Sequence, residues 1–168
     1  VGIAGNRRFL LMASAGYDAQ VTALAHKSRR GRFGYANFVF PMWRTLKKGD
    51  FPQVRVEMNG RVHTCRHVVV ANVSNYGGPF RPAPGAIYND GEFDVVMFTG
   101  GGRWNMVRYG VLACCMSNAP KDDIIRMRTD KVSLSSDAPV PIQMDGDPAG
   151  FLPRMFHIKR DDVTIIVP

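Results

Sequence analysis

The fold class follows from residues 54–73, which read VRVEMNGRVHTCRHVVVANV. Apolar and charged side chains alternate from Val54 to Met58, as they do in a strand with one buried face. Asn59-Gly60 comes next, and this dipeptide between two alternating runs is the strongest short signal for a hairpin. The run from His67 to Val73 is almost entirely apolar, which is typical of a strand buried on both faces. The stretch therefore predicts short, paired strands packed into a core.

The rest of the chain continues this pattern of short apolar or alternating runs. Its 168 residues include 17 glycines and 11 prolines, which indicate many turns. Further strands are expected at residues 8–15, 93–99, 124–129, 131–135, 140–145 and 163–167. These runs predict a mainly β fold, a sandwich or barrel of about ten or more short strands with two or three helices.

Three segments have the pattern of helices. Asp18 has the side chain of an N-cap for a first helix, which Gly31 would end. A second helix is expected over residues 33–47, with an interruption near Pro41. The third begins at about Arg103 after three glycines, and four of its side chains follow helical spacing: Trp104, Val107, Val111 and Cys115.

The net charge of +8 is concentrated in one segment. Residues 19–49 contain no acidic residue and seven basic ones: Lys27, Arg29, Arg30, Arg32, Arg44, Lys47 and Lys48. Five aromatic residues are interleaved with them: Phe33, Tyr35, Phe38, Phe40 and Trp43. Basic residues beside exposed aromatics suit an anionic membrane surface or a nucleic acid. If the aromatics are core residues instead, the charges are only a solvated rim, and the sequence leaves both interpretations open.

Composition excludes several classes of protein. A hydrophobic content of 45% argues against disorder, and no apolar run approaches the roughly 18 residues of a membrane span. Three cysteines are too few for a disulfide framework, which favours a reducing, intracellular setting. The first residue is Val and no signal-peptide pattern follows, so we expect a fragment of a longer protein.

Two loops carry clustered carboxylates. Asp145-Gly146-Asp147 follows an alternating strand and has the composition of a hairpin turn, yet two carboxylates at the mouth of a sheet also suit a general base or a magnesium ligand. Residues 74–91 form a long loop with three prolines and four glycines, ending in Asn89-Asp90-Gly91. Glu92 and Asp94 follow, so carboxylate and carbonyl oxygens there could hold a hard cation, although turn chemistry alone explains the composition.

Several segments stand in a distinctive order: Arg8-Phe9 with ASAGYDA (residues 13–19), Gly31 to Tyr35, VANVSNYGG (70–78), PGA and DGEFD (84–94), PIQMDGDP (141–148) and the apolar residues 165–168. In this order they resemble the C-terminal domain of the soluble lipid kinases, the diacylglycerol kinase and sphingosine kinase superfamily. The D-G-x-x-D and q-l-D-G-E-p signatures of that superfamily are similar to residues 90–94 and 143–148. The resemblance covers nearly the entire chain.

The resemblance implies a fold and a missing partner domain. In that superfamily an N-terminal α/β domain binds ATP with a G-G-D-G-T loop, a C-terminal β-sandwich completes the active site, and catalysis takes place between them. Residues 1–168 would thus be a single antiparallel β-sandwich with the C-terminal fold of the NAD kinases and diacylglycerol kinases. The chain contains no G-G-D-G-T, so the ATP-binding domain is expected to lie outside it.

The resemblance also assigns roles to individual residues. The catalytic base of the superfamily is the Glu of D-G-E, and Asp147 stands at that position. Asp keeps the carboxylate but shortens its reach by one methylene. Asp145 would be the neighbouring carboxylate that organises a magnesium-linked charge network. A structural Mg²⁺ would be held by the Asp90 carboxylate and by the backbone carbonyls of Ile87 and Glu92.

These roles predict an ATP-dependent lipid kinase domain, inactive alone, that helps to transfer the γ-phosphate of ATP to the hydroxyl of a diacylglycerol- or sphingoid-like lipid. The expected partners are the lipid, the ATP-binding domain and an anionic membrane contacted through residues 27–48, which places the protein in the cytoplasm at the inner membrane surface. No nucleic-acid partner is expected, and a homodimer stays open. The alternatives are a non-catalytic lipid- or membrane-binding β-sandwich and a nucleic-acid-binding β-domain, although no RNP-type motif is present.

Overall fold

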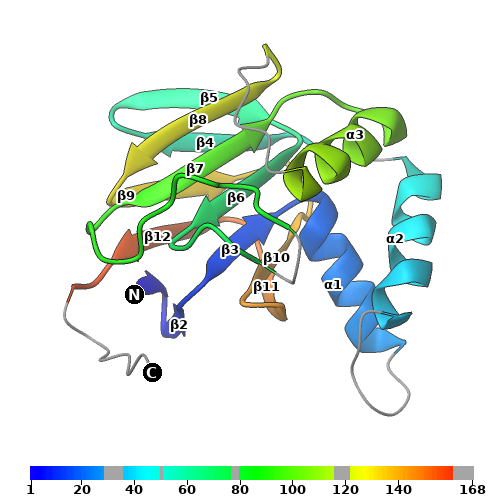
Figure 1. The fold of residues 1–168 in the computed structure, drawn as a ribbon, viewed down its shortest axis with the longest axis horizontal. Coiled ribbons are helices and arrows are strands. Elements are labelled where there is room, and N and C mark those ends of the chain that lie inside the picture. Colours follow the sequence, from blue (N-terminus) through cyan, green and yellow to red (C-terminus); the bar gives the residue numbers. More distant parts are fainter. Residues whose placement is uncertain (29–35, 50, 77–79, 116–121, 161–168) are drawn as a thin grey trace.

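Two antiparallel sheets of six strands each pack face to face (Figure 1). The computed structural model describes residues 1–28, 36–49, 51–76, 80–115 and 122–160. The first sheet has the strand order β2-β1-β12-β9-β4-β5, and the second has the order β11-β10-β3-β6-β7-β8. The predicted mainly β sandwich with two or three helices is therefore confirmed.

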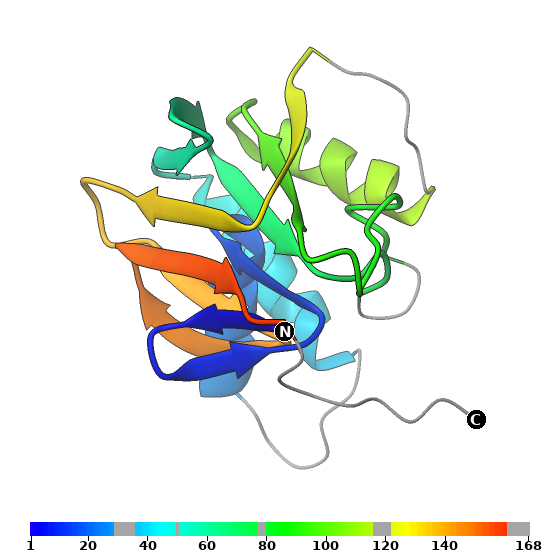
Figure 2. The ribbon, with the colours of Figure 1, turned by 90° about the vertical axis from the view of Figure 1, so that its left-hand side faces the viewer.

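The strands of the first sheet are β1 (Gly2–Ala4), β2 (Arg7–Phe9), β4 (Val54–Met58), β5 (Arg61–Cys65), β9 (Lys131–Ser135) and β12 (Arg154–Ile158). Those of the second are β3 (Met12–Ala15), β6 (His67–Ala71), β7 (Phe93–Phe98), β8 (Ile124–Thr129), β10 (Pro141–Met144) and β11 (Asp147–Phe151). The helices are α1 (Tyr17–Lys27), α2 (Ala36–Lys48) and α3 (Arg103–Cys114). In Figure 1 the three helices gather at one end of the sandwich. Figure 2, with β12 (red) toward the viewer, shows α1 and α2 behind the sheets.

The core between the sheets is built by the alternating side chains of their strands. Val54 and Val56 of the β4–β5 hairpin are fully buried there, and Asn59 and Gly60 form its turn with positive φ angles of 50° and 71°. Phe9 of the first sheet stacks on Phe93 of the second with ring centroids 5.5 Å apart. Burying one such side chain stabilises the fold by about 1.5–3 kcal/mol, so these pairs hold the layers together.

Strand β6 is buried on both faces, as its apolar sequence predicts. Val68 and Val70 lie in the core between the sheets, whereas Val69 and Ala71 belong to a second cluster with Met106 and Tyr109 of α3. The outer face of the second sheet is therefore covered by α3 and the loop before β7. In the described part of the chain, no helix is long and apolar enough to cross a membrane.

Several predicted boundaries are wrong. The single strand expected at residues 8–15 is divided into β2 and β3 by a bend at Leu10-Leu11. The backbone N–H groups of this bend donate hydrogen bonds to the Asp145 carboxylate. Helix α1 begins at Tyr17, so Asp18 lies in its first turn and not at its N-cap, and the helix ends at Lys27 before Gly31. The expected strand at residues 163–167 lies outside the described residues.

Helix α2 also differs from its prediction. It runs from Ala36 to Lys48 through Pro41, so no interruption occurs there in the described helix. Strands β1, β11 and β12 were not expected. Each buries only one or two side chains, so its sequence lacks a clear alternation.

Candidate functional site

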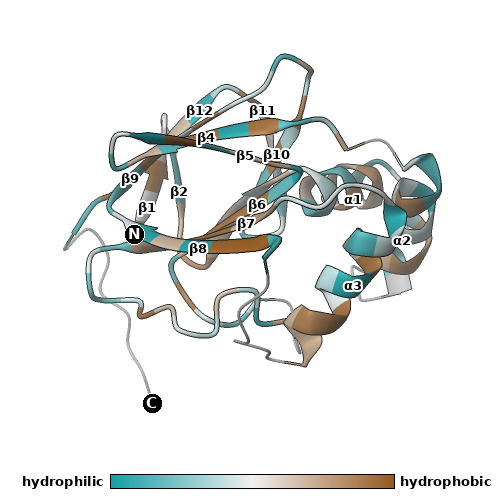
Figure 3. Cartoon of the chain, turned by 90° about the horizontal axis from the view of Figure 1, so that it is seen from above, coloured by the Kyte–Doolittle hydropathy of each residue, from teal (hydrophilic) through white to brown (hydrophobic). Residues whose placement is uncertain are grey.

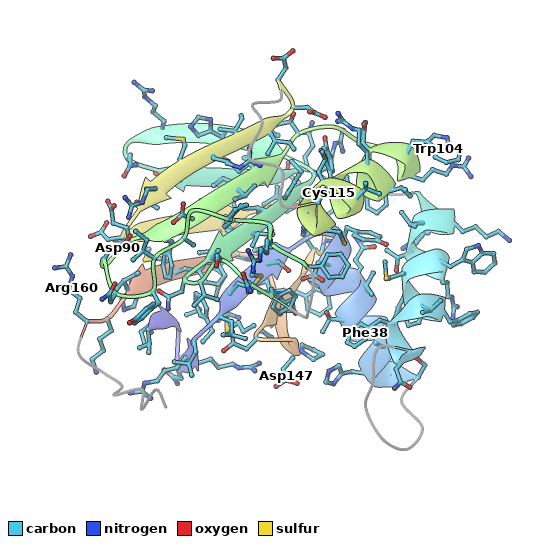
Figure 4. The ribbon with its side chains drawn as sticks, in the orientation of Figure 1. Phe38, Asp90, Trp104, Cys115, Asp147 and Arg160 are labelled. Carbon is cyan, nitrogen blue, oxygen red and sulfur yellow. The ribbon has the colours of Figure 1, made fainter. Side chains whose placement is uncertain are left out.

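The β10–β11 hairpin presents two of the predicted site residues at its turn. Asp145 and Gly146 have positive φ angles of 50° and 89°, which a tight two-residue hairpin turn requires and which Asp and Gly tolerate. Asp147 follows as the first residue of β11, and its side chain is 67% exposed. Figure 4 shows Asp147 at the margin of the molecule. A substrate can therefore reach this carboxylate.

The carboxylate of Asp145 serves a different purpose. Its Oδ2 accepts a hydrogen bond from the backbone N–H of Leu10 at 2.7 Å, and its Oδ1 accepts from Leu11 and Met12 at 2.8 and 3.0 Å. Asn72 secures the same bend, because its Nδ2 donates to the Leu10 carbonyl at 2.9 Å. Asp145 thus fixes the segment between β2 and β3 beside the hairpin, and its neighbour Asp147 is the carboxylate left open to solvent.

A buried glutamine joins the hairpin to the rest of the site. Gln143, which is fully buried, donates from Nε2 to Ser14 Oγ and to Asp18 Oδ2, both at 3.0 Å. Its Oε1 accepts from the Gly146 N–H at 2.8 Å and from the Tyr76 hydroxyl at 3.3 Å. The side-chain amide is therefore satisfied at both ends, as a buried polar group must be. It ties β3, α1, the hairpin turn and the loop after β6 into one polar network.

Tyr76 brings a neutral hydroxyl to this network. Burial raises the pKa of Tyr76 far above its usual range, and the carboxylates of Asp18, Asp145 and Asp147 raise it further. The phenol therefore stays protonated at every physiological pH. Because this one proton is donated to Gln143 Oε1, Tyr76 acts as a neutral donor that holds the Gln143 amide beside the hairpin turn.

His26 approaches Asp147 from helix α1. Its Nε2 is 3.6 Å from Asp147 Oδ1 and 3.2 Å from the Gly146 carbonyl oxygen. The residue comes from the last turn of α1, where it is partly exposed. The imidazole is thus placed to orient the Asp147 carboxylate and, when protonated, to pair with it.

The acidic loop before β7 forms a second cluster. Asp90 Oδ1 accepts the N–H of Glu92 at 3.0 Å, and the other oxygen of Asp90 pairs with Arg128 of β8. The Arg128 guanidinium also lies 3.2 Å from Glu92 and 3.9 Å from Asp94. The guanidinium of Arg128 therefore lies within ion-pair distance of three carboxylates.

A second arginine covers the same loop. A Cβ at Gly91 would lie 2.5 Å from Nε of Arg160, which shows how closely this side chain approaches the loop, and the φ of +79° at Gly91 favours glycine. Figure 4 shows Arg160 beside Asp90. The two arginines do not neutralise the cluster fully. Burial raises the pKa of Asp94, Arg128 opposes this shift, and the charges of Asp90 and Glu92 add to it.

The residues of this loop fit a hard cation. Asp94 Oδ2 is buried without a hydrogen-bond partner among the described residues, and the available donors are oxygens, which Mg²⁺ and Ca²⁺ prefer. Within the described ranges no three His, Cys, Asp or Glu side chains could share a metal, so a cation would need carbonyl ligands such as Ile87 and Glu92. Ile87 is half exposed in the same loop.

The structure does not bring the two groups of predicted site residues together. Asp147 begins β11 at one edge of the second sheet, whereas Asp90 pairs with Arg128 of β8 at the opposite edge. Figure 4 shows Asp90 and Asp147 well apart. A cation at Asp90 would therefore act on the fold and not on a group bound at Asp147.

Comparison with known proteins identifies the family. Residues 12–167 match the family model described as the YegS C-terminal NAD kinase beta sandwich-like domain. The chain belongs to this family. No curated protein matches the chain. The predicted resemblance to the C-terminal domain of the diacylglycerol kinase superfamily is thereby confirmed.

Solved structures from Bacillus anthracis str. Sterne share the fold of the family member described here. Two are structures of a "putative diacylglycerol kinase", with TM-scores of 0.69 and 0.67 and identities of 16% and 18%; each match covers 95% of this chain and 52% or 53% of the other. A third, of a diacylglycerol kinase, has a TM-score of 0.60 at 15% identity and covers 94% and 48%. The chain therefore spans about half the length of these structures.

The polar network of this YegS-type domain was only partly foreseen. The sequence predicts Asp18 as a helix cap, and it places Tyr76 and Gln143 inside motifs without assigning a role to either. A signal was nevertheless present, because three of the motif segments (residues 13–19, 70–78 and 141–148) each supply a side chain to the same network. His26 stands outside those segments, and nothing in the sequence pointed to it.

Proposed function

We propose that the chain is the C-terminal domain of an ATP-dependent lipid kinase that phosphorylates the hydroxyl of a diacylglycerol- or sphingoid-like lipid. Family membership and the kinase fold of its structural neighbours support the kinase origin. The observation that carries the proposal is the exposed Asp147 carboxylate at a turn where three family motifs meet. An ATP-binding domain outside this chain would supply the nucleotide and the other wall of the cleft.

The reaction assigns a definite role to each group. The lipid hydroxyl oxygen attacks the γ-phosphorus of ATP, the bond from that phosphorus to the β,γ-bridging oxygen breaks, and ADP leaves. Asp147 takes the proton of the hydroxyl as the new O–P bond forms. Asp145 and Gln143 hold the turn in place, and His26 orients the base. Because Asp is shorter than Glu, the lipid hydroxyl must approach the hairpin more closely than in a relative with D-G-E.

Phosphate transfer in the full-length protein tests the proposal. With ATP and Mg²⁺, we expect transfer of the terminal phosphate to diacylglycerol or sphingosine in mixed micelles, followed by chromatography of the lipid product. The 168-residue chain alone is expected to transfer none, because the nucleotide site lies outside it. A folded full-length protein that binds these lipids but phosphorylates none of them would favour the alternative, a non-catalytic lipid-binding sandwich.

We also propose Mg²⁺ as a structural ligand of the acidic loop, held by the Asp90 carboxylate and the carbonyls of Ile87 and Glu92. This site is supported by the buried Asp94 Oδ2, which accepts no hydrogen bond among the described residues, and by three carboxylates beside two arginines. When bound, the cation would neutralise charge and brace the loop before β7.

Thermal unfolding measures this effect without an activity assay. Mg²⁺ at roughly ten times its Kd should raise the unfolding midpoint by about 3–6 °C, since ligand binding at that concentration adds about 1.4 kcal/mol. Asp90→Asn should abolish the increase. Asp137→Asn is the matched control, because it removes the charge of another arginine-paired aspartate and should leave the increase intact. If Mg²⁺ left the unfolding midpoint of the parent protein unchanged, the proposed Mg²⁺ site would be wrong. The arginines would then be the counter-ions of the loop carboxylates.

A further inference from the structure

The basic and aromatic segment predicted from the sequence is only partly buried. Phe40 and Trp43 are exposed and Phe38 is half-buried, so the alternative in which all the aromatics belong to the core is wrong for α2. Phe33 and Tyr35 lie outside the described residues. A second, smaller group of basic side chains lies outside this segment, on strands β2 and β12 of the first sheet.

Arg154 is the first residue of β12 and its side chain points inward. Side chains alternate between the two faces of a strand, so Arg154 shares a face with Phe156, which lies in the core, and with Ile158, which packs against it. The Arg154 Nε is buried and finds no hydrogen-bond acceptor among the described residues. A buried donor without an acceptor costs free energy, and in a native protein it indicates a water, an ion or a ligand.

Two glycines leave room beside the Arg154 guanidinium. A Cβ at Gly5, in the turn between β1 and β2, would stand 3.3 Å from Nη1, and a Cβ at Gly150 of β11 would stand 3.6 Å from Nη2. The guanidinium therefore lies between the β1–β2 turn and β11, which is the edge strand of the second sheet. Figure 3 shows β1, β2 and β12 at the end of the sandwich away from α3.

Arg7 brings a second guanidinium to the same strand. It extends from β2, the edge strand of the first sheet, and its Nη1 donates a hydrogen bond to the Pro148 carbonyl oxygen at 2.8 Å. Pro148 and Gly150 are two residues apart on β11, about 7 Å along a strand. The Arg7 and Arg154 guanidinium groups thus face one short stretch of β11, and neither forms an ion pair with a carboxylate in the described part of the chain.

Two positive charges without a counter-ion favour a ligand with two negative charges. The planar fork of a guanidinium donates to two oxygens of an oxyanion at once. A phosphate group carries about −1.5 to −2 charges at neutral pH and three acceptor oxygens, whereas a carboxylate carries a single charge. Phosphate therefore matches the Arg7 and Arg154 pair more closely.

We propose that Arg7 and Arg154 form a binding site for a phosphate group where β2 and β11 meet at the edges of the two sheets. Arg154 supplies the buried donors, and the exposed Arg7 closes the site from the solvent side. Nucleotides and phosphorylated lipids both carry such a group. The inference goes beyond the proposed kinase reaction, because binding at this site requires neither a lipid hydroxyl nor phosphate transfer.

Calorimetric titration of the full-length protein with inorganic phosphate tests the site. Arg7→Gln and Arg154→Gln should each weaken phosphate binding by about 10–100-fold, because each removes charge-assisted hydrogen bonds. Arg61→Gln is the matched control, since it removes the same charge from β5 at the opposite edge of the first sheet and should keep the parent affinity. Phosphate bound elsewhere in the full-length protein is common to all variants. Equal affinity in the three variants would overturn the proposal.

Two soluble probes separate the sources of the phosphate. Glycerol 3-phosphate represents a lipid headgroup, and ADP represents a nucleotide. If the arginines hold a headgroup, Arg154→Gln should weaken binding of glycerol 3-phosphate at least about tenfold and leave that of ADP unchanged. The reverse result would assign the site to the nucleotide. Parent-like binding of both probes to Arg154→Gln would contradict a phosphate site.

A stability measurement separates a ligand site from a structural arginine. Arg154→Met keeps a long apolar side chain but removes the buried guanidinium. Without phosphate, its thermal unfolding midpoint should equal or exceed that of the parent, because the desolvation cost of the unpaired donor is gone. A lower midpoint together with unchanged phosphate affinity would mean that Arg154 only packs β12 against the β1–β2 turn, and the proposal would be wrong.

Discussion

Replacing Asp147 with Asn should lower kcat for lipid phosphorylation in the full-length protein by about 10²–10⁴-fold, the usual contribution of a positioned general base. The amide keeps the size of the side chain but cannot take the proton of the attacking hydroxyl. KM for the lipid should change little, because the carboxylate acts on the proton and not on the lipid tail. Steady-state rates in mixed micelles, with initial velocities over a range of lipid concentration, measure both constants.

Asp147→Asn should leave the fold intact. The side chain is 67% exposed, and His26 Nε2 lies 3.6 Å from its Oδ1. The free energy of unfolding should therefore stay within about 0.5 kcal/mol of the parent value. Asp137→Asn is the matched control, since this aspartate is 85% exposed and pairs with Arg55 of β4, not with a residue of the hairpin turn. Its kcat should equal that of the parent.

A conservative variant separates a base from a structural residue. Asp147→Glu should retain activity, because glutamate keeps the carboxylate and restores the longer side chain of the D-G-E pattern. If Asp147→Asn remained as active as Asp137→Asn, the base would be misassigned. Proton transfer at this position is identified if Asp147→Asn keeps its full stability but loses activity. Asp147→Glu should then recover the activity.

Local patterns predicted much of the fold correctly. The alternation of Val54, Val56 and Met58 and the Asn59-Gly60 turn place the β4–β5 hairpin, because strand period and turn chemistry depend on neighbouring residues. The bend at Leu10-Leu11 could not be predicted in this way. It is held by the carboxylate of Asp145, which is 134 residues away from Leu11 along the chain. Only the folded structure brings such groups together.

Periodicity also leaves the direction of a face undetermined. Trp104, Val107 and Val111 follow the spacing of a buried stripe, yet they face solvent, and Met106 and Tyr109 face the sheet. Spacing shows that side chains share a face but not what covers that face. The same limit applies to the candidate site, where the carboxylates were found by composition. The partners His26 and Gln143 depended on how α1 packs against β10 and β11.

Asp145→Ala should destabilise the protein by about 2–4 kcal/mol, a large part of the 5–15 kcal/mol of a typical domain. Two costs add. Three backbone N–H groups lose a charged acceptor, for about 1–3 kcal/mol in total because two of them can turn to water. Alanine must also adopt the left-handed conformation of residue 145, where φ is 50°, for about 1 kcal/mol more.

A second substitution separates these two costs. Asp145→Asn tolerates the left-handed conformation and keeps one oxygen acceptor, so we expect a smaller loss of about 1–2 kcal/mol. Asp137→Ala, which breaks only an exposed pair with Arg55, should cost less than about 1 kcal/mol. Urea unfolding followed by circular dichroism gives all three values. If Asp145→Ala were no less stable than Asp137→Ala, the carboxylate would not be what holds the bend between β2 and β3. The hairpin turn that presents Asp147 would then need another anchor.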